Sequence, residues 1–271
     1  MKKFAVLGSP IEHSLSPEIH NLFSRQTGID LTYEAIEVSE SSFVETVNRL
    51  FNLGYDGLNI TLPLKGMAFE NAIKTSVEST QIKAVNTLWI ENNEINGHST
   101  DGGGLVMDLS LKGLEIRENS VLIIGAGAAA RSIIPALIKL KPAKISIANR
   151  TSEKAIKLAQ DFKSSYAEIY GTGLELKNHL IGYDAIINTS SHEALGSSIE
   201  FSNIIFKNTK WFYDLMYAKS TTSFVKNAKK NGVKNSCDGI GMLIAQAALS
   251  FEIWTGIKPE IGTIMDEFTD N

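Results

Sequence analysis

The chain has 271 residues, a formal net charge of −4 at pH 7 and one cysteine. Its 43% hydrophobic and 21% charged residues are typical of a globular enzyme and exclude a disordered or collagen-like chain. The mild acidity argues against nucleic acid or an anionic membrane surface as the main partner. A single cysteine excludes an intrachain disulfide and a cysteine-rich zinc site. We therefore expect a cytoplasmic protein, without membrane spans, of about two domains.

Short β-branched runs alternate with helical patterns in the first part of the chain, which is typical of an α/β fold with parallel sheets. Ser16 precedes a proline and an acid, so we expect Ser16 to cap a helix that ends near Gly28. Asn92-Asn93 is expected to turn a hairpin. The predicted strands are Phe4–Gly8, Tyr33–Val38, Gly57–Ile60, Val85–Glu91 and Ile95–His98, and a second helix covers Ser42–Phe51.

The α/β alternation restarts after a helix that begins near Gly102, where three glycines suit a hinge. This second unit has the pattern of a Rossmann-like, dinucleotide-binding domain. Its predicted strands are Val121–Ile124, Ile145–Ala148, Ala185–Asn188 and Trp211–Leu215, and its helices are Ala128–Leu140, Ser152–Phe162 and one near Thr222–Asn231. A long helix over Ile240–Trp254 comes next in the chain.

A buried strand ends in Gly125-Ala126-Gly127 and a helix starts at Ala128. Glycines allow a tight turn and a close approach to a pyrophosphate, and the helix directs its amides and dipole at that anion. The third glycine position is Ala130, which the fingerprint permits. Glycine-rich turns also occur in other α/β loops, so a purely structural turn is the alternative.

The end of the next strand favours NADP over NAD. An NAD-binding fold usually has an acid here for the ribose hydroxyl. This strand instead ends in Asn149-Arg150-Thr151, with Lys154 one turn later. Arg150 can pair with a 2′-phosphate through two hydrogen bonds, and Lys154 adds a second cation. The alternative is a pair of solvated charges.

Motifs along the chain resemble those of the shikimate dehydrogenase family. Gly8–Asn21 contains His-Ser-Leu-Ser-Pro, and Asn59–Lys65 reads Asn-Ile-Thr-Leu-Pro-Leu-Lys. Further matches are Ala84–Thr87, Thr100–Gly102, the glycine loop, Asn149–Thr151, Asp214–Tyr217 and Asp238–Gln246. The motifs occur in the family's order and spacing and cover essentially the whole chain.

The resemblance implies reversible reduction of 3-dehydroshikimate to shikimate with NADPH, in chorismate and aromatic amino-acid biosynthesis. It implies a substrate-binding catalytic domain over 1–101 with 238–271, a Rossmann-like NADP-binding domain over 102–237, and a cleft between them. We accordingly expect small-molecule ligands, without nucleic acid, membrane or metal, and a monomer or homodimer.

The resemblance also assigns roles to single residues. Lys65 and Asp101 form the catalytic pair. Ser14 and Ser16 hold the substrate carboxylate. The ring hydroxyls contact Asn59, Thr61, Asn86, Asp101 and Gln246, and Tyr217 lines the substrate side. The cofactor-binding residues are Gly125, Ala126, Gly127, Ala128, Ala129, Asn149, Arg150, Thr151, Lys154, Leu215 and Gly239.

The residues themselves fit this chemistry but leave alternatives. Oxidation of an alcohol needs a group that takes the hydroxyl proton, and Lys65 lies just after a strand end, where α/β folds build sites. A solvated lysine is the commoner case. Gln246 lies in an apolar helix and needs a partner, either substrate or backbone. His13 and His20 lack a third metal ligand, so we expect structural histidines.

Three positions depart from the family pattern. Ser99 replaces an asparagine, Ala128 replaces a glycine, and Glu193 replaces a glycine in the segment after Asn188. Two other functions remain open: a quinate/shikimate dehydrogenase of broader specificity, and a non-catalytic NADP-sensing protein. The presence of both Lys65 and Asp101 argues against a sensor, which needs no proton-transfer pair.

Overall fold

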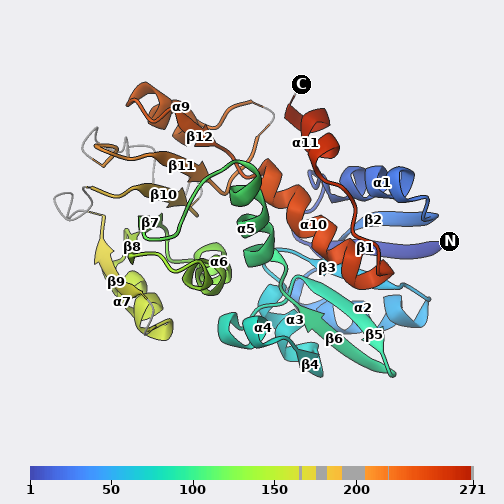
Figure 1. The fold of residues 1–271 in the computed structure, drawn as a ribbon. Helices are drawn as coiled ribbons and strands as arrows, with labels where there is room; N and C mark the ends of the chain where they lie inside the picture. Colours follow the sequence, from blue (N-terminus) through green and yellow to red (C-terminus); the bar gives the residue numbers. More distant parts are fainter. Residues whose placement is uncertain (165–166, 175–181, 191–204, 219, 270–271) are drawn as a thin grey trace. The chain divides into compact units, whose positions relative to one another are not determined.

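The computed structural model describes residues 1–164, 167–174, 182–190, 205–218 and 220–269. The chain divides into two compact units, Met1–Gly104 with Leu243–Asn271, and Leu105–Met242. The divisions fall within α5 (Asp101–Leu111) and α10 (Ile240–Thr255). Each unit combines helices with its own sheet (Figure 1). None of the described helices has the length and apolar character needed to cross a membrane.

The sheet of the first unit is mixed, in the order β2-β1-β3-β5-β6-β4. Its strands are β1 (Lys2–Gly8), β2 (Leu31–Glu37), β3 (Gly57–Ile60), β4 (Lys74–Thr75), β5 (Thr87–Glu91) and β6 (Glu94–His98). β1 is parallel to β2 and β3, whereas β5 is antiparallel to β3 and β6. Asn92 and Asn93 have φ angles of 52° and 64°, so the predicted hairpin is confirmed.

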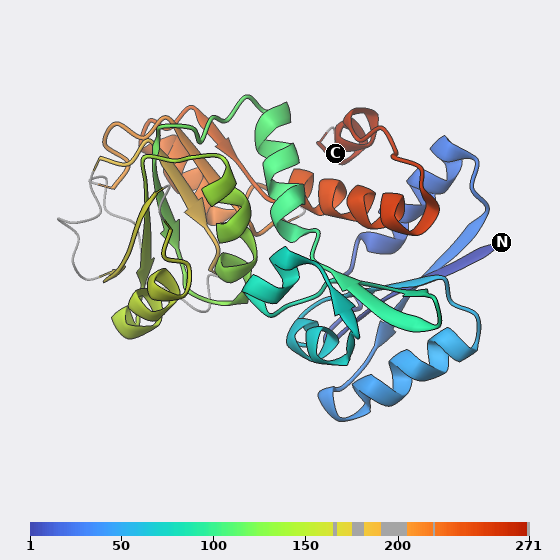
Figure 2. The ribbon, with the colours of Figure 1, turned by 60° about the horizontal axis from the view of Figure 1, so that its bottom comes forward.

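Helices cover both faces of this sheet: Figure 2 shows α1 and α10 on one face and α2 on the other. The helices are α1 (Ser16–Thr27), α2 (Phe43–Asn52), α3 (Lys65–Asn71), α4 (Val77–Ile82), α10 and α11 (Gly262–Thr269), with a 3-10 turn η1 (Glu40–Ser42). Trp254 of α10 stacks on Phe4 with ring centroids 4.6 Å apart. A Cβ at Gly57 would lie 2.4 Å from the Trp254 ring, so β3 needs glycine there.

The predicted capping role of Ser16 is wrong. Leu15 occupies the N-cap position, and Ser16 belongs to the first turn of α1. The hydroxyl that reaches this helix end belongs to Ser14, whose Oγ accepts a hydrogen bond from the Ser16 amide at 3.3 Å. The helix therefore begins one residue earlier than a Ser16 cap requires.

The second unit contains a parallel sheet in the order β12-β11-β10-β7-β8-β9. The strands are β7 (Ser120–Ile124), β8 (Lys144–Asn149), β9 (Glu168–Gly173), β10 (Ala185–Asn188), β11 (Trp211–Asp214) and β12 (Asn235–Cys237). The chain moves outward from β7 through β8 and β9, then returns to build the other half from β10. This is the doubly wound Rossmann order, which confirms the predicted fold class.

The strand order reverses between β7 and β10, and open α/β sheets bind ligands at the carboxyl ends of such strands. Both strands are buried throughout, as expected in a parallel sheet covered on both faces. The helices of this unit are α6 (Ala128–Lys139), α7 (Ser152–Asp161) and α9 (Ser223–Lys230). Glu193, the third departure from the family pattern, lies outside the described residues.

Candidate functional site

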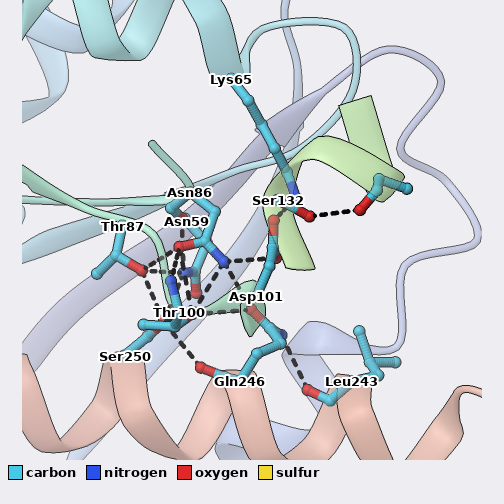
Figure 3. Close-up of polar contacts among 11 residues, drawn as sticks. Asn59, Lys65, Asn86, Thr87, Thr100, Asp101, Ser132, Leu243, Gln246 and Ser250 are labelled. Carbon is cyan, nitrogen blue, oxygen red and sulfur yellow. Dashed lines mark hydrogen bonds and ion pairs between the residues drawn. The ribbon is translucent and has the colours of Figure 1, made fainter. Parts of the chain in front are cut away.

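Lys65 and Asp101 form an ion pair in the first unit. Lys65 begins α3, Asp101 begins α5, and Lys65 Nζ donates to Asp101 Oδ2 at 2.7 Å (Figure 3). The side chains are 21% and 7% exposed. The other carboxylate oxygen, Oδ1, accepts from Asn86 Nδ2 at 2.9 Å. Both oxygens of Asp101 therefore act as acceptors, and the N-terminus of α5 further stabilises the negative charge.

Asn86 lies at the centre of the polar network in Figure 3. The Thr100 backbone amide donates to Asn86 Oδ1 at 2.9 Å, which sets the orientation of the side-chain amide. Besides Asp101, Nδ2 lies 2.9 Å from Thr100 Oγ1 and 3.1 Å from Gln246 Oε1. The Asn86 amide therefore links three elements of the site: the strand β5 that it precedes, α5 and α10.

Gln246 satisfies both of its polar ends inside the protein. Its Nε2 donates to the Leu243 carbonyl at 2.8 Å, and its Oε1 accepts from Asn86. The two helices meet closely here, because a Cβ at Gly104 of α5 would lie 2.7 Å from the Gln246 backbone nitrogen. Gly104 is thus required for Gln246 to reach Asn86.

Asn59 is buried, and its amide is engaged by protein groups. Its Oδ1 accepts from Tyr33 Oη at 2.8 Å, and its Nδ2 donates to the Asn86 carbonyl and to Ser250 Oγ, both at 3.0 Å. The other expected substrate residues lie at element ends: half-buried Ser14 and buried Ser16 at the start of α1, and half-buried Thr61 just after β3.

His20 is a core residue rather than a surface or ligand position. Its ring is fully buried and stacks on Tyr33 with centroids 4.1 Å apart. Burial lowers the pKa of His20 to about 3, and the neighbouring Asn59 opposes this shift only in part. The imidazole is therefore neutral at physiological pH.

The two glycines of the loop after β7 have different local environments. Gly125 has a φ of 106°, and a Cβ there would lie 2.5 Å from Thr189 Oγ1, so the fold itself requires glycine. Gly127 has an ordinary φ of −92°, is exposed, and has no described atom within 4 Å of a Cβ position. Because packing does not require Gly127, its missing side chain fits a ligand approaching the backbone.

Gly127 is the N-cap of α6, whose first turn carries no acid. Ala126, Ala128 and Ala129 complete the loop with small side chains, and Gly127 and Ala128 are exposed. A helix N-terminus with exposed amides and no competing carboxylate binds anions well. The local chemistry therefore fits the pyrophosphate of a dinucleotide.

Arg150 directly follows β8, the strand next to β7, and Lys154 lies in the first turn of α7 beside Glu153; both cations are exposed. Asn149 Nδ2 donates to the Thr151 carbonyl at 3.0 Å and shapes this turn. Within the described ranges neither cation has an ion-pair partner. Two cations without an acid at the strand end fit a 2′-phosphate.

Leu215 and Gly239, both expected near the nicotinamide, contact each other. A Cβ at Gly239 would lie 2.2 Å from the Leu215 carbonyl oxygen, so this close approach requires glycine. The Gly239 amide donates to the Met216 carbonyl at 3.1 Å. The segment after β11 also includes Tyr217, which is 36% exposed.

Comparisons with known proteins agree along the chain. Residues 6–88 match the family model of the shikimate dehydrogenase substrate binding domain, residues 108–230 that of shikimate / quinate 5-dehydrogenase, and residues 239–267 that of the shikimate 5′-dehydrogenase C-terminal domain. The shikimate dehydrogenase (NADP(+)) of Vibrio atlanticus is 41% identical over 270 residues, covering 99% of this chain and 97% of that protein. This chain belongs to the shikimate dehydrogenase family.

Solved structures extend this family relationship to the fold. A crystal structure of shikimate dehydrogenase from Thermus thermophilus, in complex with NADP(H) and shikimate, aligns with a TM-score of 0.87 at 29% identity, covering 99% of this chain and 98% of that one. An enzyme from Pseudomonas putida aligns with a TM-score of 0.91 at 32% identity, covering 99% and 98%.

Sequence reasoning assigned no role to three polar residues of the hydrogen-bond network around Asn86: Thr87, Thr100 and Ser250. All three side chains are buried and hydrogen-bonded to one another or to Asn86. For Ser250 a signal was present, because it comes four residues after Gln246 in an apolar helix and so shares its face. Thr87 and Thr100 lie in two of the matching motifs, next to Asn86 and Asp101, but the resemblance assigned them no role.

Proposed function

We propose that this chain is an NADP-linked shikimate dehydrogenase, which reversibly reduces 3-dehydroshikimate to shikimate. The observation that carries the proposal is the Lys65–Asp101 ion pair, held by Asn86 in the unit that matches a substrate binding domain. This pair provides a proton donor beside a fixed anion, which is the arrangement that reduction of a ketone requires.

In the proposed mechanism Lys65 moves the proton. Asp101 accepts hydrogen bonds at both oxygens, so it serves as the anion that orients the Lys65 ammonium. NADPH, when bound, supplies the hydride for the carbonyl carbon. Lys65 Nζ gives its proton to the carbonyl oxygen as that oxygen gains negative charge, and the neutral amine takes the proton back in the reverse direction.

We propose that the remaining substrate contacts match the family pattern. Ser14 and Ser16 at the N-terminus of α1 would hold the carboxylate, which this helix end favours. Thr61, Asn86, Asp101 and Gln246 would bind ring hydroxyls, with Tyr217 a further contact. The burial of Asn59 and its internal hydrogen bonds favour support of Asn86 over direct contact with a ligand.

For the cofactor, we propose that Gly125 to Ala129 bind the pyrophosphate and that Leu215 and Gly239 contact the nicotinamide. The 2′-phosphate would be bound by the turn after β8, through Asn149, Arg150, Thr151 and Lys154. Residues 1–101 with 238–271 would then form the substrate domain and residues 102–237 the NADP domain. We further propose a cytoplasmic monomer or homodimer that binds only small molecules, which the net charge and single cysteine support.

The test is a spectrophotometric assay of reduced cofactor with each pairing of shikimate or quinate and NADP⁺ or NAD⁺. We expect the highest kcat/KM for shikimate with NADP⁺. A higher value for quinate with NAD⁺ would instead identify the quinate/shikimate enzyme of broader specificity. NADP⁺ binding without turnover of either alcohol would indicate a sensor and overturn the proposal.

A further inference from the structure

Two buried hydroxyls, those of Thr87 and Ser250, lie directly behind Asn86. Thr87 begins β5, Ser250 lies on α10 one turn after Gln246, and both are 0% exposed. Their Oγ atoms are 2.8 Å apart, and Figure 3 shows them on the side of Asn86 away from Lys65. Neither residue has a place in the proton transfer or substrate contacts proposed above.

The hydrogen bonds of this pair have a definite direction. Thr87 Oγ1 donates its only proton to Asn86 Oδ1 at 2.8 Å. With the Thr87 proton on Asn86, the proton in the shorter Thr87–Ser250 contact comes from Ser250, whose alternative acceptor is the Gln246 carbonyl at 3.1 Å. Ser250 Oγ in turn accepts from Asn59 Nδ2 at 3.0 Å, and Asn59 Oδ1 accepts from Tyr33 Oη at 2.8 Å. A chain of donors thus runs from the core to Asn86.

This direction matters because an asparagine amide can rotate by half a turn and exchange its oxygen and nitrogen. Only the observed orientation presents Nδ2 to Asp101 Oδ1; the exchanged one would place a carbonyl oxygen against the carboxylate. Three donors reach Asn86 Oδ1 and oppose the exchange: the Thr87 hydroxyl at 2.8 Å, the Thr100 amide at 2.9 Å and, more distant, the Thr100 hydroxyl at 3.2 Å. The Thr87 hydroxyl donates in this direction when its acceptor sites are filled by Ser250 at 2.8 Å and by the more distant Asn59 Nδ2 at 3.3 Å.

We propose that Ser250 is a positioning residue of this site, which acts through Thr87 to hold the Asn86 amide and thereby Asp101 in the orientation that proton transfer needs. The inference rests on the proposed function, because it concerns the rate of that reaction. A purely structural role is the competing explanation, since Ser250 Oγ also lies 3.1 Å from the Gln246 carbonyl within its own helix.

The test compares Ser250→Ala, Thr87→Val, Thr87→Ser and the Ser250→Ala/Thr87→Val double variant with the wild-type enzyme. Thr87→Val keeps the shape and removes the hydroxyl, whereas Thr87→Ser keeps the hydroxyl. Ser79→Ala is the matched control, because Ser79 is 0% exposed in the same unit and its hydroxyl contacts only Ser76 in the described network. Steady-state kinetics and urea unfolding are measured for each.

We expect kcat to fall about tenfold in Ser250→Ala and in Thr87→Val, the loss that results when one oriented hydrogen bond is missing in the transition state. The double variant should lose about the same factor rather than the product, because both side chains act in one chain of hydrogen bonds. Thr87→Ser should keep the wild-type kcat within about twofold, and KM for NADPH should not change.

Three results would overturn the inference: a Ser250→Ala kcat no lower than that of Ser79→Ala, a Thr87→Ser loss as large as that of Thr87→Val, or multiplicative losses in the double variant. If Ser250→Ala fails to fold, the comparison of Thr87→Val with Thr87→Ser still decides. A wild-type enzyme inactive on shikimate would instead overturn the proposed function, so the two failures are distinguishable.

Discussion

At the scale of single residues, Lys65 is the side chain whose loss should affect turnover most. We expect Lys65→Ala to lower kcat by about 10² or more, because the carbonyl oxygen then lacks its proton donor, while the Kd for NADP⁺ stays nearly unchanged. Kinetics and a binding titration measure the two effects. Lys74→Ala is the control, since Lys74 is 63% exposed and pairs with Glu94. Near-wild-type turnover of Lys65→Ala would remove Lys65 from its role.

His20 makes the stability of the protein depend on pH. Its pKa is 6.5 in an unfolded chain and about 3 when buried, so between these values only the unfolded state binds the proton. The stabilisation is complete above about pH 6.5 and is lost progressively as pH falls toward 3. Near pH 5 the loss is about 2 kcal/mol of unfolding free energy.

Urea unfolding at about pH 7.5 and about pH 5 tests this effect. In His20→Phe the difference in unfolding free energy between the two pH values should shrink by about 2 kcal/mol, whatever the substitution does to absolute stability. His13→Gln, which replaces an exposed histidine, should keep the wild-type difference. An unchanged difference in His20→Phe would contradict the assignment.

At the level of elements, the loop between β7 and α6 contains two glycines with different proposed roles. The fold requires Gly125, whereas Gly127 is proposed to allow a ligand to approach the backbone. Gly125→Ala should destabilise the protein by about 1–3 kcal/mol, because of its positive φ and the contact with Thr189. Gly127→Val should cost about 1 kcal/mol, the effect of Val at an N-cap, and raise the Kd for NADP⁺ at least about tenfold, because its side chain enters space near the helix amides. Unchanged NADP⁺ affinity in Gly127→Val would place the pyrophosphate elsewhere.

The turn after β8 should determine cofactor preference. Arg150→Ala removes a charge-assisted contact to the 2′-phosphate, so NADP⁺ affinity should fall about 10–100-fold while NAD⁺ affinity changes little. Arg117→Ala, which removes an exposed arginine beside Glu118, should change neither. Equal weakening of both cofactors by Arg150→Ala would contradict the contact.

At the scale of the whole molecule, the two compact units should respond to different ligands. Hydrogen exchange is expected to slow in Leu105–Met242 when NADP⁺ is added, and in Met1–Gly104 with Leu243–Asn271 when shikimate is added. The strongest protection should cover the start of α6 with NADP⁺ and the start of α1 with shikimate. Protection confined to the opposite unit would reverse the proposed division of labour.

Much of the fold could be predicted from sequence because its larger elements have local causes. The strand, glycine loop and helix around Gly125 depend on hydrophobic periodicity and on residues adjacent in the chain. The Asn92-Asn93 turn depends on positive φ angles at these two residues, which asparagine tolerates. The sequence analysis did not predict β4 and β12, which have two and three residues and are too short to show a period, or β9, whose two glycines are unfavourable in strands.

Sequence patterns alone were sufficient for the Rossmann-like unit, and sequence motifs led to the proposals that Arg150 binds a 2′-phosphate and that Lys65 and Asp101 are the catalytic pair. The hydrogen bonds that hold these side chains depend on the folded arrangement of the chain. Asn86 meets Gln246 across 160 positions, and Thr87 meets Ser250 across 163. A hydrogen bond depends on a separation of about 3 Å in space, and residues far apart in the chain leave no local pattern that reveals it.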